Sequence, residues 1–150
     1  MGLDSSGRVG RIAIDPANPD IVFIAAQGHS YGPQRERGIY RTTDGGRTWT
    51  QVLFVDENTG GIDVVMDPSN PRKLIAATWQ FEIHTWGRES GGPGSGLYMS
   101  TDGGATWTRL RGNGLPTHAA GRISLASSPQ TNRTAARWER ALRRRPRGRR

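Results

Sequence analysis

The chain contains an internal repeat, and repeats of this length fold into similar units that stack against one another. The segment 12–19, Ile-Ala-Ile-Asp-Pro-Ala-Asn-Pro, recurs at 64–71 as Val-Val-Met-Asp-Pro-Ser-Asn-Pro, an offset of 52 residues (67 − 15 = 52). The segment 38–50 recurs at 96–108 with an offset of 58 residues (102 − 44 = 58). The framework is therefore repeated, and one connection in the second copy is longer.

Each unit contains four short apolar and β-branched segments separated by Gly, Pro, Asn and Asp, which is the pattern of strands joined by turns. Four strands in about 50 residues predict a blade of a β-propeller, a four-stranded antiparallel sheet. The predicted fold class is all-β, as an incomplete propeller, and a β-sandwich is the alternative. The expected strands lie near 10–15, 21–26, 38–43 and 48–54, then 62–67, 73–78, 96–101 and 106–110.

An eight-residue pattern, [Ser/Thr]-x-Asp-x-Gly-x-Thr-Trp, occupies the turn between the third and fourth expected strands of both units. It resembles the Asp-box, or BNR repeat, and two copies in register make the resemblance specific for the fold. We expect each carboxylate to accept N–H groups of its turn and each indole to close the hairpin, which are structural roles. The residues are Thr42, Asp44, Gly46, Thr48 and Trp49, then Ser100, Asp102, Gly104, Thr106 and Trp107.

Asp-box propellers include sialidases, xyloglucan-cleaving glycoside hydrolases, sortilin-like (Vps10) receptor domains and bacterial BNR-repeat proteins. The resemblance covers residues 7–126 and looks most like the sortilin type. It implies a fragment that binds a protein, peptide or carbohydrate ligand without catalysis of its own, in an extracytoplasmic parent that supplies the remaining blades. The alternative is part of a sialidase- or xyloglucanase-like glycoside hydrolase whose active site is completed by other blades.

Strand alternation predicts that the connections 27–37, 55–61 and 79–95 lie at one end of the blades, opposite the Asp-box turns. The long connection combines aromatic rings with charged groups, which suits a sugar or peptide ligand. The simpler alternative is that its rings fold the loop onto the blade while Glu82 and Arg88 form an ion pair. The candidate ligand-binding residues are His29, Tyr31, Trp79, Glu82, His84, Trp86 and Arg88.

Catalytic and metal chemistry have little support in the sequence. Glycoside hydrolysis needs two carboxyl groups across the bond, and the pattern does not select a pair among Glu36, Asp56, Glu57, Glu82 and Glu89. We therefore assign no catalytic residue. The spacing of the histidines matches no zinc motif, so we expect no metal and no cofactor.

The net charge of +8 comes from one end of the chain. Residues 133–150 hold nine Arg and Glu139, a net +8, whereas residues 1–132 hold 12 basic and 12 acidic residues, a net zero. We interpret residues 131–150 as a non-native tail, which predicts no sequence-specific nucleic-acid binding; a genuine basic arm is the alternative.

The repeat gives a division into a first blade at 7–54, a second at 55–116 and the start of a third at 117–130. No run approaches the roughly 18 apolar residues that span a bilayer, and the N-terminus lacks the apolar region of a signal peptide. The chain has no cysteine and thus no disulfide.

Overall fold

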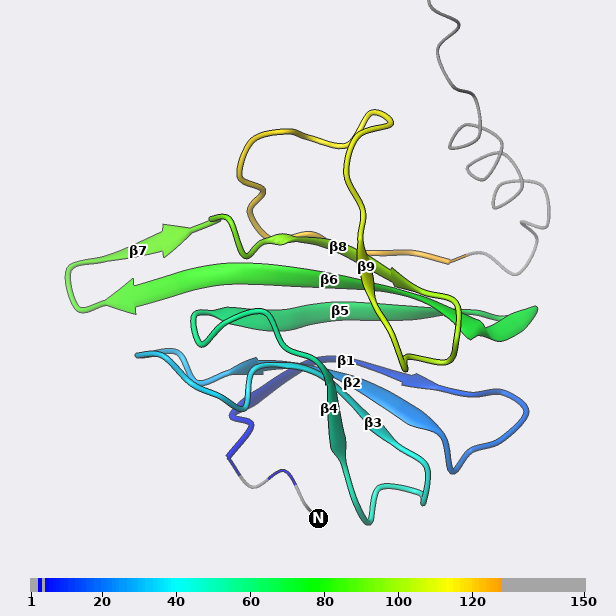
Figure 1. The fold of residues 1–150 in the computed structure, drawn as a ribbon. Coiled ribbons are helices and arrows are strands. Elements are labelled where there is room, and N and C mark those ends of the chain that lie inside the picture. Colours follow the sequence, from blue (N-terminus) through cyan, green and yellow to red (C-terminus); the bar gives the residue numbers. More distant parts are fainter. Residues whose placement is uncertain (1–2, 4, 128–150) are drawn as a thin grey trace, which may run out of the picture.

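The structure, a computed structural model, describes residue 3 and residues 5–127, which form β-strands and connections without a helix (Figure 1). No helix in this part of the chain is long and apolar enough to cross a membrane. The strands are β1 (Arg8–Ile14), β2 (Val22–Gly28), β3 (Gly38–Thr42), β4 (Thr50–Leu53), β5 (Thr59–Asp67), β6 (Asn70–His84), β7 (Gly87–Ser90), β8 (Gly96–Ser100) and β9 (Thr108–Arg109).

The strands form two antiparallel sheets whose order follows the repeat. The first has the order β1-β2-β3-β4, and the second has the order β5-β6-β8-β9 with β7 paired to the far part of β6. Each repeat unit thus builds one sheet in which neighbours along the chain are neighbours in space. The prediction of an all-β fragment made of four-stranded propeller blades is confirmed.

The two sheets pack face to face, and their main core lies between them (Figure 1). Phe23, Ala25, Ile39 and Leu53 come from the first sheet, and Val64, Met66, Leu74, Ala76 and Tyr98 from the second. These side chains alternate with outward-facing residues along each strand, as the period of two requires. We call these two surfaces the inner faces and the opposite surfaces of both sheets the outer faces.

The Asp turns, 42–49 and 100–107, lie at one end of the sheets. In the first, Asp44 Oδ1 accepts the Thr48 N–H (2.9 Å) and the Thr42 hydroxyl (2.7 Å). In the second, Asp102 makes the same contacts with Thr106 and Ser100. Each turn also donates an N–H to the carbonyl of a neighbouring turn, from Gly45 to Asp20 and from Gly103 to Arg72.

These hydrogen bonds favour the ionised carboxylates. The Thr42 hydroxyl, followed by the hydroxyl and N–H of Thr48, holds the pKa of Asp44 well below its usual range. The hydroxyl and N–H of Thr106, followed by Ser100, lower the pKa of Asp102 in the same way. Within the turns, Gly46 and Gly104 adopt φ of 90° and 81°, a region that side chains disfavour.

The long connection 79–95, predicted to be a loop, contains a β-hairpin. Strand β6 runs on to His84, and β7 returns beside it, so that Phe81 pairs with Ser90 and Glu82 with Glu89. The alternation of Phe81 and Ile83 with Glu82 and His84 is the strand pattern that accounts for this hairpin. The hairpin projects beyond the second sheet (Figure 1).

Residues 121–127 form no strand but pack on the outer face of the second sheet. Ile123 and Leu125 contact the cluster of Ile62, Ala77, Trp79 and Phe81, and the Leu125 N–H donates to Asp63 Oδ2 (2.8 Å). That these residues start a third blade stays a prediction. The tail at 131–150 lies outside the described residues.

Candidate functional site

Three connections meet at the end of the sheets opposite the Asp turns. The β2–β3 connection joins the β4–β5 connection through the Gln34 N–H, which donates to the Glu57 carbonyl (2.8 Å). The β4–β5 connection joins the hairpin through the Phe81 N–H, which donates to the Asn58 carbonyl (3.3 Å). The predicted grouping of 27–37, 55–61 and 79–95 at one end is confirmed, and we call this surface the loop end.

Arg37 holds the loop end together from inside. Its side chain is 1% exposed. Its Nη1 donates to the Asn58 carbonyl (2.7 Å), and Nη2 donates to the carbonyls of His29 and Gly32 (both 3.1 Å). Burial lowers the pKa of this guanidinium, and the negative charge of Asp56 opposes that shift. Arg37 therefore links the first sheet's connection to the second sheet.

The base of the hairpin is fixed by buried aromatic and polar contacts. Trp79 and Phe81 stack with their ring centroids 4.6 Å apart. The Trp79 indole N–H donates to the Ser90 hydroxyl (3.1 Å), which ties β6 to the end of β7. Gln80 Oε1 accepts the Gly94 N–H (2.8 Å) and so closes the Gly-rich segment onto β6. The hairpin is anchored, and its outer part is free to contact a ligand.

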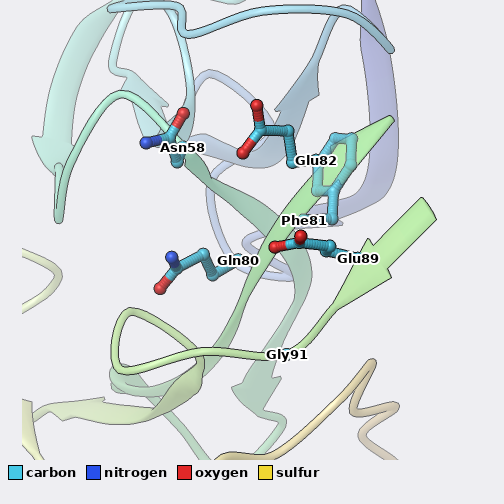
Figure 2. A pocket seen from close by; sticks show the side chains of 6 residues that line it. All are labelled: Asn58, Gln80, Phe81, Glu82, Glu89 and Gly91. Carbon is cyan, nitrogen blue, oxygen red and sulfur yellow. The ribbon is translucent and has the colours of Figure 1, made fainter. Parts of the chain in front are cut away.

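A shallow, open hollow with room for little more than one water molecule lies between the hairpin and the β4–β5 connection. Figure 2 shows that Glu82 and Glu89 approach it from the two strands of the hairpin, while Asn58 borders it from the neighbouring connection. Its lining residues are Asn58, Gln80, Phe81, Glu82, Glu89 and Gly91. Two carboxylates and two amides give the pocket acceptors and donors for hydroxyl groups.

The tip of the hairpin carries an exposed aromatic surface. Trp86 is 85% exposed, and its ring stacks on His84 with centroids 4.9 Å apart and planes 4° apart. His84 Nε2 in turn lies 3.4 Å from the Glu82 carboxylate. These contacts orient the indole while leaving its other face open. Tyr31, on the β2–β3 connection of the first sheet, is 67% exposed.

The predicted site residues divide into three groups. Tyr31, Glu82, Trp86 and Arg88 are exposed at the loop end, and His84 is half-buried beneath Trp86. Trp79 is 7% exposed and packs the hairpin base, so its ring does not face a ligand. His29 contributes its carbonyl to Arg37.

The alternative prediction for the long connection was that its aromatic rings fold it onto the blade and that Glu82 pairs with Arg88. The structure agrees with the first part for two of the three rings and does not agree with the second part. Trp79 and Phe81 do fold it onto the sheet, whereas Trp86 does not. Glu82 contacts His84, and among the described residues no ion pair joins it to Arg88.

Four residues that shape the loop end were not among the predicted site residues, and they are Arg37, Asn58, Gln80 and Gly91. Of these four, Gln80 could have been identified from the sequence. The alternation within 79–84 predicts a strand, and a strand places Gln80 and Glu82, which flank Phe81, on the same side. Arg37 gave no signal, since nothing in its local sequence separates a buried arginine from the exposed Arg35.

Glu82 and Glu89 lie directly opposite each other, a spacing of about 5 Å between Cβ atoms in paired strands. Both approach from the same hairpin, whereas glycoside hydrolysis places its two carboxyl groups on either side of the scissile bond. In the described part of the chain, no group of three or more His, Cys, Asp or Glu residues is placed to hold a metal ion. The arrangement suits binding of hydroxyl-rich ligands.

Comparison with known proteins points to xyloglucanases. A xyloglucanase from Paenibacillus sp is 31% identical over 110 residues, which cover 68% of this chain and 9% of the relative. Xyloglucanase Xgh74A from Acetivibrio thermocellus is 31% identical over 107 residues, 66% of this chain and 11% of the relative. No protein-family profile matches the chain.

Among solved structures, an ancestral GH74 enzyme superposes with a TM-score of 0.50 and 26% identity, over 69% of this chain and 12% of that one. The chain spans about a tenth of the length of the curated relatives that it matches. The short share of each relative that the chain covers is consistent with a fragment of a propeller. These relatives support the glycoside hydrolase alternative better than the sortilin-like interpretation that the sequence favoured.

Proposed function

We propose that this chain is a two-blade part of a xyloglucanase-type glycoside hydrolase propeller, in which it supplies polysaccharide-binding surface. The observation that carries the proposal is the 31% identity over 110 residues to a xyloglucanase. The structural likeness to a GH74 enzyme supports it, because it covers a similar share of the chain. A complete parent would hold the catalytic pair across other blades.

The loop end has the chemistry that a glucan chain requires. A sugar ring presents an apolar face, which stacks on an exposed indole, and a rim of hydroxyl groups, which bond carboxylates and amides. Trp86 offers the indole, and His84 behind it fixes the plane. The pocket with Glu82, Glu89 and Gln80 offers the polar partners a few residues away on the same hairpin. We infer that one or two backbone sugars bind along β6 and β7.

The same proposal places the parent outside the cytoplasm, since a polymeric glucan does not cross a membrane. It also assigns a different ligand from a sortilin-like scaffold, which would bind a protein or peptide. No feature of the loop end selects a peptide over a sugar, whereas the similar proteins are named for xyloglucan.

The test is binding of xyloglucan oligosaccharides to the purified chain, followed by tryptophan fluorescence and by calorimetry. Trp86→Ala should weaken binding about tenfold or more, because the stacking surface is lost. Trp86→Phe keeps a ring and should retain most of the affinity. Both variants should melt like the parent, since Trp86 is exposed.

Two outcomes would overturn the proposal. One is equal affinity of the parent and Trp86→Ala for xyloglucan. The other is binding of peptides, but not of xyloglucan, at the loop end.

A further inference from the structure

The connection that follows β9 contains a tight turn beginning at Gly112. The Leu115 N–H donates to the Gly112 carbonyl (3.0 Å), and the two residues between them, Asn113 and Gly114, adopt φ of 53° and 87°. Positive φ at both central positions is the geometry of a type I′ turn, for which Asn-Gly is a favoured pair. The connection begins at the loop end, because β9 runs there from the second Asp turn.

Few contacts hold this turn. Asn113 and Gly114 are exposed, and a Cβ placed on Gly112 or on Gly114 would meet no heavy atom of a non-neighbouring residue within 4 Å. Within the described residues, neither the Asn113 side chain nor the Gly114 N–H makes a hydrogen bond. The backbone on either side of Asn113 can therefore rotate once the hydrogen bond that closes the turn opens.

An exposed Asn followed by Gly can react within the chain itself. The Gly114 nitrogen attacks Cγ of the Asn113 side chain, a C–N bond forms, and the side-chain amide leaves as ammonia with the proton of the attacking N–H. Water then opens the resulting succinimide ring. Opening at the side-chain carbonyl leaves aspartate, and opening at the backbone carbonyl leaves isoaspartate. Glycine favours ring closure because it places no side chain beside the attacking nitrogen.

The other asparagines of the described residues lack a nitrogen that can attack. Asn18 and Asn70 each precede a proline, whose nitrogen carries no proton. Asn58 precedes Thr59, which is buried and whose N–H donates to the Asp56 carbonyl (3.2 Å). Within this part of the chain, the reaction is therefore confined to the turn after β9.

Each Asp turn contains an Asp-Gly pair that could form the same ring by loss of water. In the folded chain, however, the attacking nitrogens are engaged, because the Gly45 N–H donates to the Asp20 carbonyl (3.1 Å) and the Gly103 N–H donates to the Arg72 carbonyl (2.9 Å). The hydrogen bonds that hold the pKa of both carboxylates low also keep them ionised, whereas ring closure needs the neutral acid. The fold thus protects these two pairs.

We propose that Asn113 is a site of spontaneous deamidation, which the folded chain converts to aspartate and isoaspartate while its Asp-Gly pairs stay intact. Either product adds a negative charge, and isoaspartate also adds a methylene group to the backbone of the turn. The same connection borders the base of the hairpin, since a Cβ on Gly91 would lie 2.9 Å from the Ala120 carbonyl oxygen. The conversion therefore changes the charge of a connection at the loop end, whichever ligand binds there.

Incubation of the purified chain at mildly acidic and mildly alkaline pH tests the site, with one sample folded and one unfolded in guanidinium chloride. Trypsin then releases the peptide 112–122, whose only asparagine is Asn113. Mass spectrometry measures the change from amide to acid, and chromatography separates isoaspartate from aspartate. Asn113 should convert in both samples at rates that differ no more than severalfold. Asp44 and Asp102 should form isoaspartate in the unfolded sample and stay unchanged in the folded one.

A matched pair of variants assigns the charge change to one residue. Asn113→Gln should abolish the acidic species that ion-exchange chromatography resolves after incubation, because a glutamine would have to close a larger ring. Asn18→Gln should leave that species in place. The proposal is overturned if Asn113 stays intact in the folded chain while the unfolded chain converts it. It is also overturned if the Asn113→Gln chain yields the acidic species at the rate of the parent.

Discussion

The guanidinium of Arg37 lies over the ring of Phe81, with its Cζ atom 4.4 Å from the ring centroid. The contact joins the last residue before β3 of the first sheet to β6 of the second. Cation–π attraction is strongest where water is excluded, as it is around this buried side chain. Arg37 therefore adds a side-chain contact between the two sheets to the backbone hydrogen bonds that join the connections at the loop end.

Arg37→Met should destabilise the chain by about 3 kcal/mol or more, because the carbonyls of His29, Gly32 and Asn58 lose their donor inside the protein. Urea unfolding measures the loss. Arg35→Met is the matched control. Arg35 is exposed and pairs with Glu57, so its loss should cost less than about 1 kcal/mol. Equal losses in the free energy of unfolding for the two variants would show that the buried contacts of Arg37 do not stabilise the loop end.

Gly104→Ala should destabilise the chain more than Gly103→Ala. Both glycines have positive φ, which costs a side chain about 1 kcal/mol. A Cβ on Gly103 meets open space, whereas a Cβ on Gly104 would lie 2.6 Å from Phe23 Cε1 on the first sheet. We expect about 2 kcal/mol of further loss from that overlap. Equal melting temperatures would mean that the second Asp turn does not pack on the first sheet.

Most of the fold could be predicted from the sequence because the repeat and the strand period agree. Strand β2, expected at 21–26, forms at Val22–Gly28. The turns at 42–49 and 100–107 form where the Asp and Gly residues predict them. The hairpin was missed because two glycines and a proline after Ser90 outweighed the short alternation before it. Periodicity over four residues is too brief to separate a strand from a loop.

The candidate site could be predicted only in outline. Strand alternation placed the three connections at one end, since this needs only the chain direction. Which side chains are exposed depends on packing across the two sheets. Trp79 and Trp86 are seven residues apart in one segment, yet one is buried and the other is open. Local sequence holds no information on that difference.

Stability should fall as the pH drops below about 4, in part because of Asp44 and Asp102. Their pKa values are lowered in the folded chain, so between the folded and unfolded values the unfolded state binds more protons. This contribution is present above the unfolded pKa and is lost as the pH falls toward the folded one. Melting temperatures from about pH 6 to about pH 3 measure it.

The double variant Asp44→Asn, Asp102→Asn should melt at a lower temperature at neutral pH and show a shallower loss on acidification. Asp20→Asn is the control, since the Asp20 carboxylate takes no part in the Asp turns. A parent and double variant with parallel pH profiles would exclude the Asp turns as the source of the acid sensitivity.

The chain should bind xyloglucan oligosaccharides without cleaving them. Glu82 and Glu89 stand side by side on one hairpin, so they reach a glucan from a single side, and Glu82 is already engaged by His84. Hydrolysis needs an acid on one side of the bond and a base or nucleophile on the other. Glu82→Gln and Glu89→Gln should therefore change affinity while products stay absent in a reducing-sugar assay. Turnover by the parent that either substitution abolishes would identify the hairpin as a catalytic pair.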